Sequence, residues 1–332
     1  MSPESVPAIV VDDIASWFVS LTAFVFGACW GSFFNVAIYR WPLGLSVVSP
    51  PSHCPNCNAR IPAWLNFPIL GYLFLRGKTA CCGTPLSPRY PVVELLGGVL
   101  AVAVTQQVFV NLEPTTPILD ACLLALCYYA FAGGLLIATF VDLEHMEIPD
   151  EVSLPGTALG LLTASYRDPP GAADAALGAG AGFLFIQVLF VWSYERMTGR
   201  RGMGEGDSKL LMMIGAFLGW EGAAFALVAG AVQGVVVALV ALARGWGSSE
   251  IKGPEASGEN RETENRPLTE AETDEDEDED DDPPPTRFGH LKLPFGPFLA
   301  LGALEYFFFG DHLIDYWLRF AGVLAGLLGV GS

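Results

Sequence analysis

Charged residues are scarce in this chain of 332 residues, where Asp, Glu, Lys and Arg together account for 16%. A soluble globular domain carries about 25%, so the composition excludes an ordinary soluble enzyme. Basic residues are scarcer still, and the net charge of −19 argues against a nucleic-acid partner. Residues 1–13 contain no Lys or Arg. They therefore lack the basic region of a cleaved signal peptide, and we expect the first hydrophobic run to be retained.

Long uncharged runs are what the chain has instead. Hydrophobic residues make up 52%, and residues 14–39, 121–141 and 175–194 contain no Asp, Glu, Lys, Arg or His. Because about 20 apolar residues suffice for a helix to cross a lipid bilayer, we expect an all-α polytopic membrane protein with about eight transmembrane helices. The expected spans are, in chain order, 14–39, 92–112, 119–141, 152–166, 175–194, 210–220, 222–243 and 293–310.

The negative charge is concentrated in one segment. Between Glu250 and Asp282 there are sixteen acidic and three basic residues, which supply thirteen of the nineteen excess negative charges. This composition predicts a disordered acidic linker at 245–287. The full expected plan is a first helix within 1–41, a Cys-rich module at 42–90, a transmembrane core at 91–244, the linker, and a C-terminal transmembrane segment and tail at 288–332.

Basic residues gather in three expected loops, namely the Cys-rich module, the loop near 195–209 and the acidic linker. Loops rich in Lys and Arg stay on the cytoplasmic side of a membrane. With eight spans, these loops and residues 142–151 all lie on that side.

Four cysteines in the module have spacing typical of a metal site. Cys54 and Cys57 form a Cys-x-x-Cys knuckle, and Cys81 and Cys82 follow. A loop with eight prolines cannot bury a core of its own, and cytosolic thiols stay reduced. We therefore predict structural Zn²⁺ on these four thiolates. Two alternatives remain: only one of the adjacent pair binds, with His53 or water completing the shell, or the loop holds free thiols and no metal.

Two acidic clusters adjoin expected spans. Asp142 follows the run ending at Val141 and opens a D-x-E-x-x-x-I-P-D pattern, while Asp207 closes a G-x-G-D pattern before Leu210. In the expected topology both lie at cytoplasmic helix ends. Two neighbouring carboxylates can share a proton, so that one activates water while the other protonates the leaving amine. We predict that Asp142 and Asp207 are catalytic, with Asp150 either a reserve candidate or a helix cap.

Polar side chains also occur inside the first apolar run, at Ser32 and Asn35. A polar group in an apolar setting costs free energy unless it is hydrogen-bonded. These side chains either line a groove for a cofactor or substrate, or they form hydrogen bonds between helices.

Motifs along most of the chain resemble those of the type IV prepilin peptidase family. They are the G-S-F-F-N-V run at 31–36 with Tyr39, Arg40 and Pro42, the cysteine pairs, the S-P-R-Y-P-V-V-E run at 87–94, the two aspartate patterns, and the P-F-G-P-F run at 294–298. The sequence departs from the family's second knuckle. In the family pattern a cysteine would stand at the position of Thr79 and pair with Cys82.

The resemblance implies two activities in the bacterial inner membrane. One is cleavage of the basic leader of prepilins and pseudopilins at the cytoplasmic face by Asp142 and Asp207. The other is N-methylation of the new amino terminus with S-adenosylmethionine, for which Asn35 is our candidate cofactor-binding residue. Two other interpretations remain: an intramembrane G-x-G-D protease of the presenilin or preflagellin type, which lacks the cysteine module, and a non-catalytic, zinc-stapled scaffold or assembly factor of a secretion or pilus system.

Overall fold

The structure is a computed structural model. It describes residues 15–52, 54, 56–62, 65, 67–167, 169–199, 204–244 and 293–327, with side chains except those of residues 198, 311 and 313–327. The predicted acidic linker at 245–287 lies outside the described residues, as does His53. The chain divides into two units, Met1–Val232 with Pro294–Ser332, and Gln233–Leu293. The helix packing and the sites described below belong to the first unit.

The described residues form helices and no strand, apart from an isolated bridge between Lys78 and Pro85. A 3₁₀ turn at 164–166 follows α5, and a π-helical segment at 187–192 joins α6 to α7. The helices are α1 (Ser16–Arg40), α2 (Leu70–Phe74), α3 (Arg89–Asn111), α4 (Ile118–His145), α5 (Asp150–Thr163), α6 (Ala172–Ile186), α7 (Ser193–Thr198), α8 (Glu205–Ala243) and α9 (Gly296–Leu327).

Five described helices are long and apolar enough to cross a membrane, so the expected count of about eight is not confirmed. They are Ser16–Arg40, Arg89–Asn111, Ile118–His145, Ala172–Met197 and Glu205–Ala243. The expected span at 152–166 contains α5, whose 14 residues reach about 21 Å at 1.5 Å each, short of a bilayer core of about 30 Å. Those at 210–220 and 222–243 both fall within α8. The one at 293–310 coincides with the first part of α9, where Gly296–Gly310 is a short apolar stretch.

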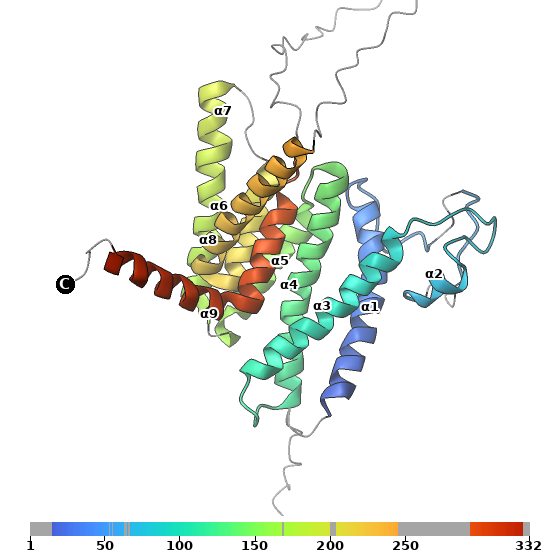
Figure 1. Ribbon diagram of the computed structural model, residues 1–332. Helices are drawn as coiled ribbons and strands as arrows, with labels where there is room; N and C mark the ends of the chain where they lie inside the picture. The colour runs from blue at the N-terminus through green and yellow to red at the C-terminus, as the bar shows by residue number, and fades with distance from the viewer. Residues whose placement is uncertain are drawn as a thin grey trace, which may run out of the picture. The chain divides into compact units, whose positions relative to one another are not determined.

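Helix α1 packs along α3, and α4 contacts α1, α3, α5 and α9 (Figure 1). Gly27 and Gly31 of α1 lie against Gly97 of α3, and a Cβ atom at Gly31 would come within 2.7 Å of the Glu94 Cα. Helices in lipid gain little from hydrophobic burial, and small residues at a crossing allow the close backbone packing that holds them together. The glycines spaced four residues apart on α1 therefore specify its contact with α3.

Helix α8 is broken at Gly219, whose φ of 73° and ψ of −176° are not helical. The break deprives the preceding carbonyls of their helical N–H partners. Arg167, which is 2% exposed, donates to the carbonyls of Ala216 and Phe217 and to that of Gly160 in α5. Its guanidinium also lies over the Phe217 ring, 4.8 Å from the centroid. One buried cation therefore caps the first arm of α8 and ties it to α5.

Replacing Arg167 with methionine is expected to destabilise the bundle, because three buried carbonyls lose their donor at a cost of about 1–3 kcal/mol each. We expect the apparent melting temperature in detergent to fall by about 5 °C or more. The exposed Arg76 provides the matched control, Arg76→Met. Equal melting temperatures for the two variants would contradict the capping role.

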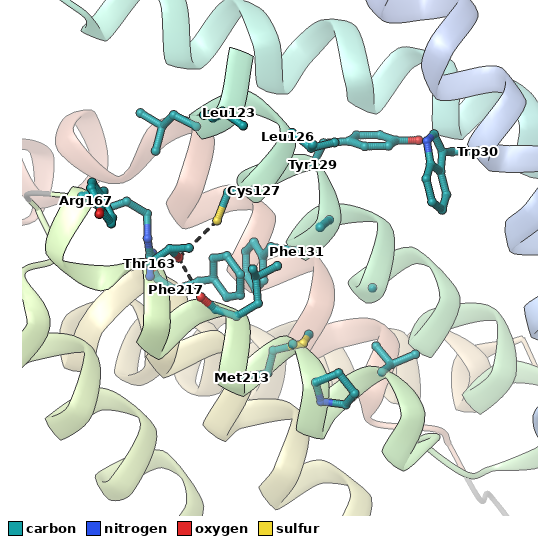
Figure 2. Close-up of a pocket in the computed structure, with 18 of the residues that line it drawn as sticks. Trp30, Leu123, Leu126, Cys127, Tyr129, Phe131, Thr163, Arg167, Met213 and Phe217 are labelled. Carbon is teal, nitrogen blue, oxygen red and sulfur yellow. Dashed lines mark hydrogen bonds between the residues drawn. The ribbon is translucent and has the colours of Figure 1, made fainter. Parts of the chain in front are cut away.

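A large apolar cavity of about 1110 Å³ adjoins Arg167. Trp30 of α1, Tyr129 and Phe131 of α4 and Met213 of α8 are among the side chains that line it (Figure 2). Neither Asp142 nor Asp207 belongs to its lining. This cavity is therefore distinct from the acidic cavity described below.

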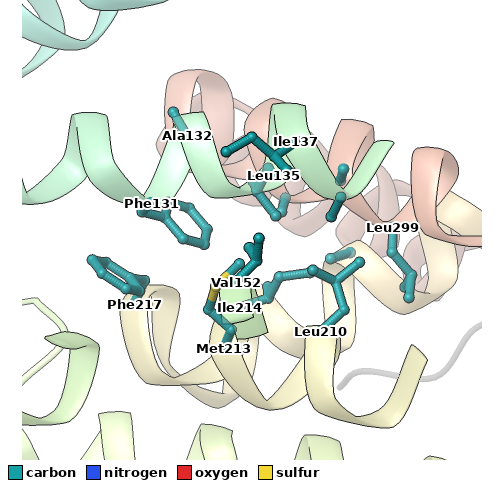
Figure 3. Close-up of a cluster of buried hydrophobic side chains, with 14 of the residues drawn as sticks. Phe131, Ala132, Leu135, Ile137, Val152, Leu210, Met213, Ile214, Phe217 and Leu299 are labelled. Carbon is teal, nitrogen blue, oxygen red and sulfur yellow. The ribbon is translucent and has the colours of Figure 1, made fainter. Parts of the chain in front are cut away.

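The buried core holds the start of α8 against α4 (Figure 3). The rings of Phe131 and Phe217 stack with their centroids 4.5 Å apart. Toward the start of α8, fully buried aliphatic side chains continue the contact between α4 and α8. This contact orients the two helix ends that carry the aspartates. These side chains include Leu135 of α4, Leu210, Met213 and Ile214 of α8, and Leu299 of α9.

Candidate active site

Asp142 and Asp207 lie close together at neighbouring helix ends. Asp142 is in the last turn of α4 and Asp207 in the first turn of α8, with exposed fractions of 5% and 8%. The two carboxyl groups are near enough to interact electrostatically, and both line a cavity of about 390 Å³. The residues predicted from two distant patterns therefore share one partly enclosed, acidic cavity, as a carboxylate dyad requires.

The rim of this cavity is charged and contains one ion pair. Lys209 Nζ donates to both carboxylate oxygens of Asp150, at 2.7 Å each, and Glu147 and Glu205 also line the cavity. Asp150 is the first residue of α5, and the N-cap position belongs to Pro149. Its observed role is therefore to tie the start of α5 to the start of α8, beside the two buried aspartates.

Ile148 of the I-P-D run explains a glycine in the G-x-G-D pattern. A Cβ atom at Gly206 would lie 2.9 Å from the Ile148 Cβ. A larger residue at position 206 would therefore push the first turn of α8 away from the α4–α5 connection. Glycine at this position allows Asp207 to approach Asp142.

Gly296 is a site residue that the sequence reasoning missed. Its backbone N–H donates to Oδ2 of Asp142 at 2.8 Å, and it is the first residue of α9. The P-F-G-P-F run served only as a signature at the start of an apolar helix. A Gly-Pro pair is typical of a helix start at which the glycine backbone comes close to another group. The sequence does not say which side chain that group belongs to.

The four cysteines form one cluster. The Sγ atoms of Cys54, Cys57, Cys81 and Cys82 all lie within 4.8 Å of one another, and Cys54 is buried while the other three are exposed. Tetrahedral coordination with Zn–S bonds of about 2.3 Å places sulfurs about 3.8 Å apart. The Cys54–Cys82 and Cys81–Cys82 separations are 3.6 and 3.9 Å. The donor set therefore fits a zinc ion. Although Cys81 and Cys82 are adjacent in the sequence, both sulfurs can face the same metal ion.

Thr79 contacts the cluster although it is not a metal ligand. Its hydroxyl lies 3.3 Å from the Cys82 sulfur, and hydrogen bonds from Thr79 and then from Thr84 lower the pKa of the Cys82 thiol to about 5. The thiolate is the form of cysteine that binds metals. At the position where the resemblance implies a cysteine, this chain thus has a hydroxyl that stabilises the neighbouring thiolate.

Asn35 is 3% exposed and connects α1 to α3. Its Nδ2 donates to the carbonyl of Tyr90 at 3.0 Å, which is the inter-helix hydrogen bond considered above. Its Oδ1 atom is buried and has no hydrogen-bond partner within the described part of the chain. One end of the amide is therefore structural, and the other is buried without a partner among the described residues.

Comparison with known proteins gives the family. Two family models match, "Bacterial Peptidase A24 N-terminal domain" over residues 25–108 and "Type IV leader peptidase family" over residues 129–239. A prepilin leader peptidase/N-methyltransferase of Klebsiella pneumoniae is 38% identical over 205 residues, which cover 60% of this chain and 84% of the relative. The chain belongs to the type IV leader peptidase family.

Other members of the leader peptidase family align over more of the chain. The protein of the same name from Aeromonas hydrophila is 35% identical over 67% of this chain and 81% of its own length. That from Stutzerimonas stutzeri is 28% identical over 91% of this chain and 94% of its own length. No solved structure matches the chain significantly.

The two matched regions coincide with the two groups of candidate residues. The peptidase match contains Asp142 and Asp207, and the amino-terminal match contains Asn35 and the cysteine cluster. The predicted linker at 245–287 lies outside both matches. Gly296 also lies outside them, although it contacts Asp142 directly.

Proposed function

We propose that this chain is a membrane aspartyl endopeptidase that removes the basic leader of prepilins and pseudopilins and methylates the new amino terminus. The observation that carries the peptidase proposal is the pair of buried aspartates, Asp142 and Asp207, on one cavity. The names of the family relatives support both activities. The alternative of a non-catalytic scaffold is not favoured, since it gives no reason for two carboxylates to approach each other in a buried setting.

Asp142 and Asp207 perform acid–base chemistry on a bound water. Like charges so close do not both ionise readily, so the pair holds one proton. The ionised carboxylate removes a proton from water, which attacks the scissile carbonyl. The protonated one stabilises the developing oxyanion by hydrogen bonding and then transfers its proton to the leaving amine. The acidic rim at Glu147 and Glu205 complements a basic leader segment.

The proposed location is the bacterial inner membrane, with the acidic cavity at the cytoplasmic face. The five apolar helices support a membrane setting, and the distribution of basic loops supports the orientation. We retain the expected division into first helix, cysteine module, peptidase core, linker and C-terminal segment as part of this proposal.

We assign the cysteine cluster to structural Zn²⁺, held by Cys54, Cys57, Cys81 and Cys82. The cluster geometry supports this assignment, because four converging thiols at these separations suit tetrahedral coordination. The bound ion would hold together a loop whose only described helix, α2, has five residues. Its role is folding of the module rather than chemistry on the substrate.

S-adenosylmethionine is the proposed methyl donor, and when bound it supplies an electrophilic methyl group on a sulfonium. The new amino terminus must lose a proton before its nitrogen can attack that methyl group. We assign Asn35 to this region because its buried Oδ1 lacks a partner. That oxygen can accept a hydrogen bond from an amino group of the cofactor or of the substrate.

A single assay tests both activities. The purified full chain is mixed with a model prepilin that carries a basic leader, and the product is weighed with and without S-adenosylmethionine. We expect loss of the leader in both samples and a further gain of one methyl group only with S-adenosylmethionine. An intact prepilin would contradict the peptidase proposal, and an unmethylated product would contradict the second activity.

Replacing Asn35 with alanine is expected to reduce methylation by about 10-fold or more, because a buried hydrogen bond to the cofactor or substrate is lost. Cleavage is expected to remain within about three-fold of the unmodified chain. Ser20→Ala serves as the control, because Ser20 is a half-buried residue of the same helix whose hydroxyl accepts a hydrogen bond from Gln106 of α3. If Asn35→Ala reduces both activities equally, its hydrogen bond to Tyr90 explains the effect and the cofactor assignment fails.

A further inference from the structure

The amino-terminal end of α9 reaches the carboxylate of Asp142. The backbone N–H of Gly296 donates to Asp142 Oδ2 at 2.8 Å, in a buried contact between residues 154 positions apart. We propose that Gly296 is a positioning residue of the peptidase, whose N–H fixes the Asp142 carboxylate in its reactive orientation. This inference rests on the proposed function of the aspartate pair and adds a third helix to the machinery.

Electrostatics favour such a contact. Asp142 lies in the last turn of α4, where the negative end of the helix dipole disfavours a carboxylate. Gly296 begins α9, and a helix start presents free N–H groups and the positive end of a dipole. Pro294 and Pro297 have no N–H, so Phe295 and Gly296 are the only residues of this P-F-G-P run with a backbone donor.

Sterics explain why residue 296 is glycine. A Cβ atom there would lie 2.7 Å from Asp142 Oδ2 and 3.1 Å from Ile148 Cδ1. The first separation is too short for any side chain, so the carboxylate would have to move. The hydrogen bond engages Oδ2 and leaves Oδ1 for the attacking water. Gly296 thus supplies both a donor and the space that the carboxylate needs.

The test is a comparison of two glycine variants on the same helix. In Gly296→Ala the added methyl group displaces Asp142, and a displacement of about 1 Å in a reacting group can reduce the rate about 100-fold. In the control Gly302→Ala the methyl group meets the Ala226 carbonyl of α8 at 2.9 Å, far from the aspartates. With a model prepilin, we expect kcat of Gly296→Ala to fall about 100-fold with KM within about two-fold, and kcat of Gly302→Ala to stay within about three-fold.

A third variant separates displacement of Asp142 from crowding of Ile148. Ile148→Val removes Cδ1 and keeps the Cβ that packs against Gly206. We expect the double variant Gly296→Ala/Ile148→Val to have a higher melting temperature than Gly296→Ala, because the added methyl group no longer meets Cδ1. Its kcat should stay as low as that of Gly296→Ala. Recovery of kcat in the double variant, or equal losses in the two alanine variants, would overturn the proposal.

The aspartate variants identify which conclusion has failed. If the unmodified chain cleaves the prepilin, Asp142→Asn does not, and Gly296→Ala cleaves normally, only the positioning role is wrong. If the unmodified chain does not cleave it, the proposed function itself is wrong.

Discussion

Asparagine in place of either Asp142 or Asp207 is expected to reduce leader cleavage by about 1,000-fold or more. Asparagine retains the size of aspartate but cannot exchange a proton, so the water loses its base or the leaving amine loses its acid. Because the two carboxyl groups act as a unit, the double variant should be hardly slower than either single one. The measurement is kcat/KM with a model prepilin, on variants whose insertion and melting temperature match those of the unmodified chain.

Asp150 provides the matched control for these variants. It lines the same cavity, but its carboxylate is paired with Lys209. Asp150→Asn should therefore reduce cleavage by about 10-fold at most, since a half-exposed ion pair contributes little. Near-normal cleavage by Asp142→Asn together with none by Asp150→Asn would move the catalytic role to Asp150.

Serine in place of Cys54 is expected to remove the metal and to unfold the cysteine module. Cys54 is the buried member of the cluster, and structural zinc contributes about 10–16 kcal/mol to the folding of zinc-finger peptides. Elemental analysis of the unmodified chain should give one zinc per chain, and Cys54→Ser should give almost none. Limited proteolysis should then cut within residues 42–90 of the variant and leave the helical bundle intact.

Two further cysteine variants sharpen this result. Cys29→Ser changes a thiol of α1 outside the cluster and should leave the zinc content unchanged. Cys81→Ser should lose less zinc than Cys54→Ser, because Cys81 is exposed whereas Cys54 is buried, and water can replace an exposed ligand. Well under one zinc in the unmodified chain would contradict the metal assignment.

The membrane class and the candidate residues of the site were predictable from the sequence. Apolar runs longer than a bilayer core are local signals, and α1, α3 and α4 lie close to the predicted runs. Asp142 and Asp207 were selected because charges at the ends of apolar runs are costly. Their positions at the end of α4 and the start of α8 follow from the same runs.

The span count was harder to predict because hydropathy does not report where a helix bends or ends. Gly219 interrupts α8 through its own backbone conformation, and Arg167, some fifty residues earlier, donates hydrogen bonds to the buried carbonyls that the break leaves without helical partners. Arg167 lies outside the three basic loops of the sequence, and nothing in the local pattern connects it to those carbonyls.

The sequence by itself determined the helical membrane class, the four thiols and the two carboxylates, because each is a property of residues near one another in the chain. Only the tertiary structure decided what meets the carboxylates: the Gly296 N–H at Asp142, the Ile148 side chain against Gly206, and the Lys209–Asp150 pair. These contacts join segments distant in the chain. They depend on how the end of α4 packs against the starts of α5, α8 and α9, and neither periodicity nor composition encodes that packing.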